Sequence, residues 1–374
     1  MANRGGRPST SVRVAGLGRF DMGFDVTCPP FATRRGGVAT ASVALMIGMV
    51  LVAMTFTASS ADPDAFAYNR LLGRGMNLGN ALDAPREGAW GVTLKTEYFQ
   101  AIKEAGFNSV RIPIRWSTHA QSEPPYTIDP AFLDRVDWAI DQALSRNLFT
   151  VINIQHYWEM DQDPVRHAPR LLALWKQIAA RYQDRPQTLF FELFNEPQDK
   201  LTDQRWDEIL PELLQTIRKN NPMRMVIVGP GYWNSLDHLP ALQLPRDDRR
   251  LIVTFHYYNP FHFTHQAQDW LPTSKAWKGT SWGTAQERDE LRENFEKAAA
   301  WARQFQRPLY LGEFGSSENA DIEARVLWTR AVAREAEKLD FSWSYWQFCS
   351  SFGAYDTRTR AWNQPLLQAL LDRN

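Results

Sequence analysis

The sequence predicts an α/β fold, a single (β/α)₈ TIM barrel that occupies residues 62–374, and three observations favour it. Eight short β-rich runs alternate with amphipathic helical stretches, and a repeated order of strand then helix implies parallel strands. The units follow one another without a Pro/Ser-rich linker or a low-complexity segment. A doubly wound open sheet is the alternative, but the first strand-to-helix turn lacks the phosphate-binding glycine pattern of that fold.

The predicted strands are short runs of apolar and β-branched residues: 75–78, 109–114, 149–154, 189–193, 225–228, 251–256, 309–312 and 341–345. Apolar residues at helical spacing predict helices at 95–105, 131–146, 170–182, 203–219, 287–306 and 321–338. A barrel carries its catalytic residues at the C-terminal ends of its strands. Polar and aromatic side chains do gather where the runs end: Asn77, Asn80, Arg111, Gln155, His156, Asn195, Glu196, His256, Tyr258, Glu313 and Trp346.

Residues 1–61 differ from the rest of the chain and are typical of a targeting segment. They hold six arginines, two acidic residues and no lysine, and residues 36–61 carry no charge. An apolar core at 43–54 is followed by small residues at 58–61, where a peptidase could cut before Asp62. We interpret the segment as a bacterial signal peptide, which predicts a secreted protein, extracellular or periplasmic. A retained membrane anchor is the alternative, because the uncharged run has 26 residues and a spanning helix needs ~20.

Charge and cysteine content exclude several classes of function. Residues 62–374 keep 36 of the 42 basic and 40 of the 42 acidic residues, a formal charge of −4, which argues against nucleic acid as a partner. Only Cys349 lies after residue 61, so no disulfide can form within 62–374. The seven histidines form no HExxH motif and no His-x-His pair at a strand end, so neither a metal nor a cofactor is expected. We expect a monomer that meets a membrane only if residues 36–61 are not cleaved.

Two glutamates follow predicted strands in loops marked by glycine or proline. Glu196 lies in Phe-Asn-Glu-Pro after the fourth run, and Glu313 lies in Gly-Glu-Phe-Gly after the seventh. Residues at the ends of these strands can face each other across the mouth of a barrel. Hydrolysis of a glycoside with retention needs a carboxyl group that protonates the leaving oxygen and a second one, ~5–5.5 Å away, that attacks the anomeric carbon.

Six motifs mark the strand ends: GRGMNLGN at 73–80, VRIP at 110–113, FNEP at 194–197, HYYNP at 256–260, GEFG at 312–315 and YW at 345–346. Together they make residues 71–368 resemble glycoside hydrolase family 5, a family of retaining barrels that includes bacterial endoglucanases and mannanases. The resemblance implies that Glu196 is the general acid/base, that Glu313 is the nucleophile and that Asn195 binds the sugar 2-hydroxyl.

The resemblance also implies that Arg111, His256 and Tyr258 support the nucleophile and the sugar. Arg111 could keep Glu313 ionised through a bidentate ion pair, although an ordinary interior ion pair would look the same in the sequence. Tyr258 could donate its hydroxyl to Glu313. His256 could orient Glu196 or a sugar hydroxyl.

Two positions depart from the family pattern. Relatives commonly have two adjacent histidines after the third strand, whereas this chain has Gln155 and His156, so we expect altered sugar contacts or an altered pH response rather than lost hydrolysis. Asp83 stands where relatives often have glutamate, and we expect it to reach less far into the cleft. Asn80 and Trp346 complete the expected substrate-binding set, with Trp346 as a stacking platform for the sugar at the cleavage point.

The predicted function is therefore endo-acting, retaining hydrolysis of a β-1,4-glucan of the cellulose or glucomannan type by double displacement. A β-mannanase or a xyloglucanase is the alternative within the family, since glucose and mannose differ only at C2. A non-catalytic carbohydrate-binding barrel is an alternative of another class. Residues 259–282, which carry five aromatic residues, are expected to form a wall of the substrate cleft.

Overall fold

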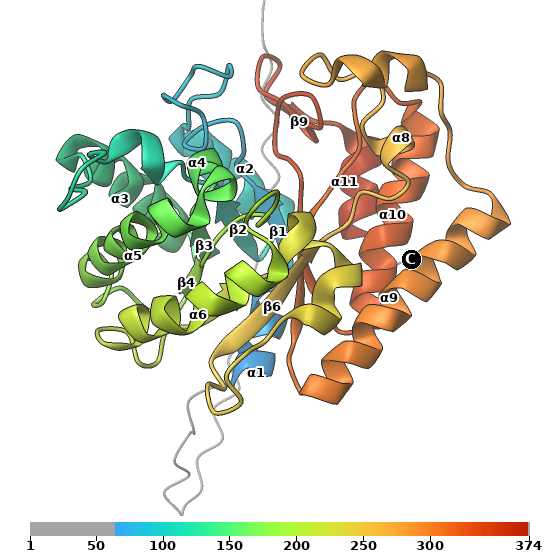
Figure 1. The fold of residues 1–374 in the computed structure, drawn as a ribbon. Coiled ribbons are helices and arrows are strands. Elements are labelled where there is room, and N and C mark those ends of the chain that lie inside the picture. The colour runs from blue at the N-terminus through green and yellow to red at the C-terminus, as the bar shows by residue number, and fades with distance from the viewer. Residues whose placement is uncertain (1–63, 373–374) are drawn as a thin grey trace, which may run out of the picture. The chain divides into compact units, whose positions relative to one another are not determined.

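The predicted TIM barrel is confirmed by the structure, a computed structural model that describes residues 64–372 (Figure 1). Eight parallel strands close into a barrel in sequence order, and the last strand pairs with the first. Within residues 64–372, no helix is long and apolar enough to cross a membrane. The predicted targeting segment lies outside these residues. The strands are β1 (Arg74–Asn77), β2 (Ser109–Ile112), β3 (Phe149–Asn153), β4 (Leu189–Glu192), β5 (Val226–Val228), β6 (Leu251–His256), β7 (Leu309–Phe314) and β8 (Ser342–Tyr345).

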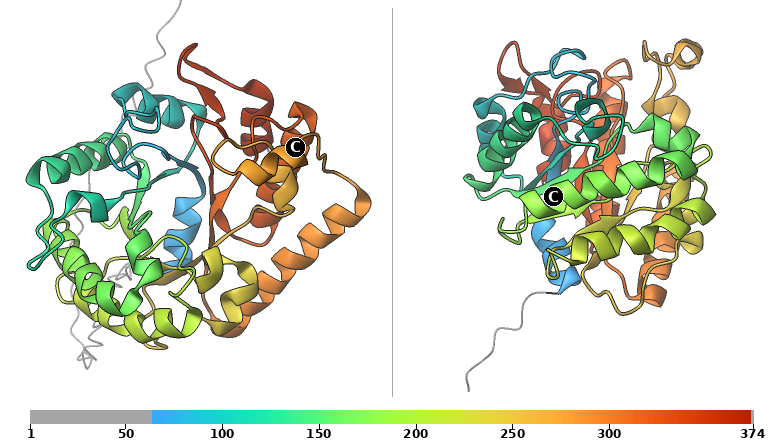
Figure 2. Two further views of the ribbon diagram at one scale, coloured as in Figure 1. Left: turned by 45° about the horizontal axis from the view of Figure 1, so that its top comes forward. Right: turned by 60° about the vertical axis from the view of Figure 1, so that its left-hand side comes forward.

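The helices form a ring around the strands (Figure 2). The main ones are α1 (Ala65–Leu72), α2 (Thr96–Ala105), α3 (Pro130–Leu144), α5 (Pro164–Arg181), α6 (Asp203–Arg218), α9 (Ala285–Phe305), α10 (Ile322–Lys338) and α11 (Gln364–Leu371). Shorter elements lie in the connections: α4 (Trp158–Gln162), α7 (Gly231–Asn234), α8 (Phe261–Thr264), the 3₁₀ turns η1 (Trp116–His119), η2 (Leu236–Ala241) and η3 (Pro272–Trp277), and the hairpin β9 (Tyr355–Asp356) and β10 (Ala361–Trp362).

The predicted bounds differ from the structure in two places that matter. Helix α5 begins at Pro164 instead of residue 170, because Pro164 suits the first helical turn and the side chain of Asp163 accepts a hydrogen bond from the backbone N–H of Arg166. Strand β7 continues to Phe314, so Glu313 lies within the strand and not after it. The earlier start of α5 is explained by its N-cap residue. The longer β7 is explained by pairing with both β6 and β8.

Helix α1 closes the N-terminal end of the barrel. The ring of Tyr68 packs edge-on against Phe190 inside the barrel, with ring centroids 5.8 Å apart. The buried side chain of Asn69 donates to the carbonyl of Leu309 at 2.8 Å and accepts from the hydroxyl of Ser342 at 2.7 Å. This end is therefore sealed by apolar packing and satisfied polar groups, which leaves the opposite end of the barrel for a substrate.

We predict that Asn69→Ala lowers the free energy of unfolding by about 1–3 kcal/mol, because it leaves a buried carbonyl and a buried hydroxyl without their partner. Chemical denaturation measures the change. Asn220→Ala, at an exposed position just after α6, is the control and should have little effect. Equal stability of the two variants would show that Asn69 does not hold α1 in place.

Candidate active site

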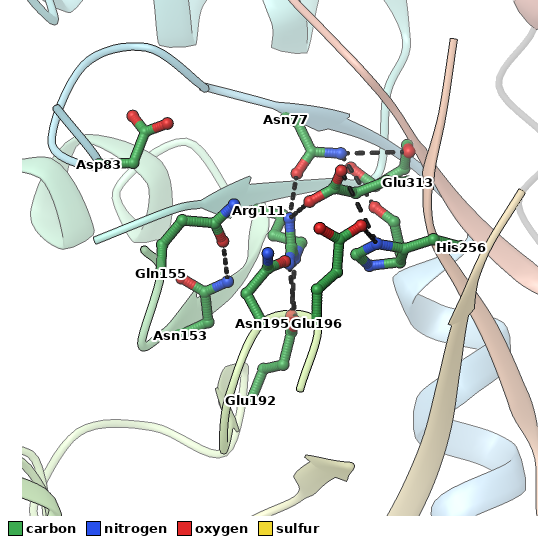
Figure 3. Close-up of polar contacts among 12 residues, drawn as sticks. Asn77, Asp83, Arg111, Asn153, Gln155, Glu192, Asn195, Glu196, His256 and Glu313 are labelled. Carbon is green, nitrogen blue, oxygen red and sulfur yellow. Dashed lines mark hydrogen bonds and ion pairs between the residues drawn. The ribbon is translucent and has the colours of Figure 1, made fainter. Parts of the chain in front are cut away.

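Arg111, in β2, lies at the centre of the site (Figure 3). It is fully buried, and its Nε and Nη2 atoms donate to the two carboxylate oxygens of Glu192 at 2.6 and 2.7 Å. Nη1 donates to Oε1 of Glu313 at 2.7 Å. The bidentate pair that we expected with Glu313 is thus formed with Glu192. The reason is geometric, since Glu192 faces the Nε edge of the guanidinium from β4 and Glu313 reaches only Nη1.

Two asparagines accept further hydrogen bonds from the guanidinium of Arg111. Nη1 of Arg111 also donates to Oδ1 of Asn77 at 2.9 Å, and Nη2 donates to Oδ1 of Asn195 at 2.7 Å. Asn77 in turn donates through Nδ2 to the carbonyl of Gly312 in β7 at 2.9 Å. Because the carbonyl of Asn195 is bound to Arg111, its amide nitrogen remains as a hydrogen-bond donor for a sugar hydroxyl.

Glu313 is aimed into the barrel mouth by irregular pairing around it. The register of β7 shifts against β6 and against β8 close to this residue, and such bulges re-aim side chains. The neighbouring Gly312 leaves room for the site, since a Cβ atom there would lie 2.6 Å from Oγ1 of Thr254 and 3.1 Å from Nε2 of His256. Glycine at this position therefore allows the histidine ring to approach the strand.

Glu196 lies in the loop after β4 with a left-handed backbone (φ 52°), which is uncommon for glutamate. Neighbouring loops hold this conformation. The backbone N–H of Asn195 donates to the carbonyl of Ile154 at 2.9 Å, and the N–H of Trp233 donates to the carbonyl of Pro197 at 3.1 Å. A strained residue that is fixed from both sides keeps its side chain in one direction.

The carboxyl groups of Glu196 and Glu313 face each other across the mouth. An oxygen of each and a ring nitrogen of His256 all lie within 4.8 Å of one another. Nδ1 of His256 is 2.7 Å from Glu196 and 3.8 Å from Glu313, and the hydroxyl of Tyr258 donates to Glu313 at 2.9 Å. The spacing fits the ~5–5.5 Å of retaining glycosidases and is shorter than the ~6.5–9.5 Å that leaves room for a water in inverting ones.

The surroundings drive the pKa values of the two glutamates apart. Burial raises the pKa of Glu196 above its ordinary value, although the hydrogen bond with His256 opposes this shift. Burial would raise the pKa of Glu313 as well, but His256, Arg111 and the hydroxyl of Tyr258 together outweigh burial and hold it below its ordinary value. The two pKa values are thus shifted in opposite directions, the kind of division that an acid and a nucleophile need.

Glu196, His256 and Glu313 are also the group within residues 64–372 whose ligand atoms could surround a metal ion. A cation there would have to compete with the Arg111 guanidinium, 2.7 Å from Glu313, and with the hydrogen bond between His256 and Glu196. The set is therefore better suited to proton transfer than to metal binding.

Asp83 and Asn80 lie in the turn after β1. Asp83 is fully buried, and its carboxylate accepts the backbone N–H groups of Asn80 at 3.0 Å and Ala81 at 2.7 Å. Burial raises its pKa to about 7. The side chain of Asn80 donates to the hydroxyl of Ser350 at 3.0 Å. Asp83 therefore shapes the turn, and Figure 3 shows it apart from the two glutamates.

Gln155 and His156 have different surroundings although they are adjacent. Gln155 is buried and its carbonyl accepts from Asn153 at 2.6 Å, so its amide nitrogen remains as a donor for a ligand. The ring of His156 lies 5.3 Å from that of Trp90 and 5.6 Å from that of Trp158. Burial lowers the pKa of His156 to about 4, so this histidine is neutral near pH 7.

Aromatic residues complete the mouth. Trp346 follows β8 and is partly exposed, and its ring packs on Gly79, where a Cβ would lie 2.6 Å from the ring. Residues 259–282, expected as a wall of the substrate cleft, hold α8 and η3. In this segment Phe263 is buried whereas Trp270 is 62% exposed, so only part of it can face a ligand.

Glu192 and Trp158 lie at the site although none of the sequence motifs marks them. Glu192 lies in a predicted apolar strand, where a charged residue needs a partner, and this signal links it to a cation such as Arg111. Trp158 is 47% exposed, and the guanidinium of Arg115 lies 4.2 Å from its ring centre. No pattern in the sequence distinguishes Trp158 from the many buried tryptophans.

We predict that Arg111→Lys raises the pKa of Glu313 and destabilises the fold, since a lysine cannot replace a guanidinium that binds Glu192 with two bonds and Glu313 with a third. Carbon-13 NMR titration of the carboxyl groups and chemical denaturation measure both effects. Arg181→Lys, in a more exposed pair with Asp137, is the control. If the pKa of Glu313 is unchanged in Arg111→Lys, then Arg111 does not hold that pKa down.

Known proteins resemble this chain along the whole barrel. The family model described as Cellulase (glycosyl hydrolase family 5) matches residues 72–351. The structure of Thermotoga maritima Cel5A in complex with cellobiose has a TM-score of 0.81 and 51% identity, and the match covers 82% of this chain and 100% of that chain. The same enzyme in complex with mannotriose has a TM-score of 0.81 and 50% identity, with the same coverage.

Endoglucanase H of Acetivibrio thermocellus is 38% identical over 85% of this chain, and the match covers 35% of that protein. Cellulase/esterase CelE of the same organism is 29% identical over 79% of this chain and 39% of that protein. The chain thus spans little more than a third of the length of these curated relatives. Since the family model covers most of the chain, and the Cel5A match extends over the full length of that enzyme, the chain belongs to glycosyl hydrolase family 5.

Proposed function

We propose that the protein is a retaining endo-β-1,4-glucanase in which Glu196 is the general acid/base and Glu313 is the nucleophile. The opposed pair of carboxyl groups, with oxygens within 4.8 Å and pKa values shifted in opposite directions, carries this proposal. The names of the endoglucanases that the chain resembles support the same substrate class.

In the first step, the ionised carboxylate of Glu313 attacks the anomeric carbon while Glu196 gives its proton to the glycosidic oxygen, and the C–O bond breaks. Formation of the glycosyl ester removes the negative charge of Glu313. That charge is one of the causes that raise the pKa of Glu196, so its loss makes Glu196 more acidic. Glu196 then remains ionised and takes a proton from the water that hydrolyses the ester.

We propose β-1,4-glucan and glucomannan as substrates. Cel5A structures contain cellobiose in one case and mannotriose in another, which supports a site that accepts both sugars. We propose that the amide nitrogen of Asn195, whose carbonyl is bound to Arg111, contacts the hydroxyl at C2. Mannan and xyloglucan are the alternative substrates. Rates of the purified protein on carboxymethylcellulose, glucomannan, galactomannan and xyloglucan would decide between them.

We further propose that residues 1–61 direct export, that the barrel over 62–374 acts outside the cytoplasm, and that it acts as a monomer. The charge pattern and the apolar core at 43–54 support export. The mass of the protein recovered from the culture fluid or periplasm would distinguish a cleaved signal peptide from a retained anchor.

We predict that Glu196→Gln and Glu313→Gln each lower turnover of polysaccharide by at least ~10²-fold, because each removes a group that acts in the transition state. An aryl glycoside with a good leaving group should partly rescue Glu196→Gln, which lacks the proton donor, and should not rescue Glu313→Gln. Glu212→Gln, exposed on α6, is the control. Near-normal turnover by either site variant would overturn its assigned role.

We predict that His256→Gln moves both limbs of the pH profile of kcat/KM to higher pH. His256 lowers the pKa of both glutamates, so its loss raises the pH at which Glu313 ionises and the pH at which Glu196 loses its proton. Steady-state rates over a range of pH measure the shift. His238→Gln, whose side chain bonds to Asp203, serves as the control. Unchanged limbs would show that His256 does not set these two pKa values.

A further inference from the structure

A groove lies at the N-terminal end of the barrel, away from the two glutamates. It has a volume of about 620 Å³ and is lined by residues of α1, the C-terminal part of α9, the end of α10 and the segments at the starts of β6, β7 and β8. In Figure 1, α1 and the end of α9 lie at the lower end of the barrel and β9 lies at the upper end. Phe66, Leu309 and Phe341 give the groove an apolar floor.

The charges around this groove are mostly positive. Asp340 is the acidic residue in its lining, whereas five residues are basic: Arg70, Arg249, Arg303, Arg307 and Lys338. This excess stands out because residues 62–374 together carry a formal charge of −4. The groove is therefore a local anion-attracting surface on a chain of opposite net charge.

Most of these cations are poorly neutralised. Within residues 64–372, Arg70 has no ion pair or side-chain hydrogen bond, and Arg249 donates to the backbone carbonyl of Gln306 at 3.2 Å. The buried Arg307 donates to two backbone carbonyls, those of Asp248 and Pro245. Carbonyl oxygens satisfy the N–H groups but leave the positive charge largely in place.

The other two cations have exposed carboxylate neighbours. Arg303 is 3.9 Å from Glu296, and Lys338 is 3.0 Å from Glu335, and the side chains of both cations are more than half exposed. Exposed pairs of this kind are weak. Both cations can therefore still contribute to the attraction of an anion.

Large apolar side chains are exposed beside the cations. Phe66 is 38% exposed in the groove, Leu71 follows Arg70 and is 46% exposed, and Phe305 precedes Gln306 and is 45% exposed. A surface that combines basic and exposed apolar side chains suits the interface of an anionic bilayer, where phosphates meet the cations and apolar groups enter the headgroup region.

We propose that this end of the barrel binds the surface of a membrane that contains anionic phospholipids, with a headgroup phosphate in the groove. A membrane is favoured over a free anion because exposed apolar side chains, those of Phe66, Leu71 and Phe305, lie beside the basic ones and a free anion would leave them in water. Bound in this way, the barrel keeps its mouth with Glu196 and Glu313 at the opposite end, open to polysaccharide.

Vesicle co-sedimentation tests the proposal. Residues 62–374 are used so that the apolar run cannot insert, since the match covers the whole of the Cel5A chain and the barrel is therefore expected to fold alone. The protein should bind vesicles of phosphatidylcholine mixed with phosphatidylglycerol, should bind pure phosphatidylcholine far more weakly, and should dissociate as salt is raised. The triple variant Arg70→Gln, Arg249→Gln, Arg303→Gln should bind about 100-fold more weakly, at roughly five-fold per charge.

A second triple variant, Arg166→Gln, Arg288→Gln, Arg292→Gln, removes the same charge from exposed positions outside the groove and should keep its binding. Hydrolysis of a soluble substrate reports folding. If the groove variant fails to fold, Arg70→Gln alone should weaken binding about five-fold. Equal binding to neutral vesicles, or equal loss in both triple variants, would overturn the proposal. The proposal would also be overturned if the protein bound inorganic phosphate, or associated with itself through the groove, but did not bind vesicles.

Discussion

The ion pair network of Arg111 is the interaction on which the active site depends. A guanidinium with no exposed surface is stable inside the barrel because two carboxylates and two amide carbonyls accept hydrogen bonds from its N–H groups. Glu192 holds the guanidinium from β4 by two hydrogen bonds and the two asparagines accept one each, so one of its five N–H groups remains for Glu313. Removing one partner from such a buried network leaves an uncompensated charge, which costs far more than an exposed pair contributes.

From this constraint follows the chemical difference between the two glutamates. Glu313 is buried and Glu196 is partly buried, and loss of water contact alone would favour the neutral form of each. Arg111 bonds directly to Glu313, and Tyr258 donates to the same carboxylate, so the pKa of Glu313 is held below its ordinary value while burial raises the pKa of Glu196. The register shifts of β7 keep Glu313 in place. Hydrogen bonds of the backbone on both sides of Glu196 keep that residue in place.

The sequence predicted the barrel and the opposed glutamates because strand ends are marked by local patterns. It could not give the pairing of Arg111 with Glu192, since the choice between two carboxylates depends on which edge of the guanidinium each one faces. The basic groove was also missed, because its cations come from distant segments that meet only in the folded barrel. The role of Gln155 required the structure as well, since its carbonyl is occupied by Asn153.

The central claim is that Glu313 attacks the anomeric carbon directly from its position opposite Glu196. The most direct test follows the anomeric configuration of the first products from a β-linked glucan by proton NMR within minutes of mixing, together with mass spectrometry after treatment with a 2-fluoro glycoside. The account predicts that the β-anomer appears first and that Glu313 carries the covalent label. Initial release of the α-anomer, or a label on another residue, would contradict it.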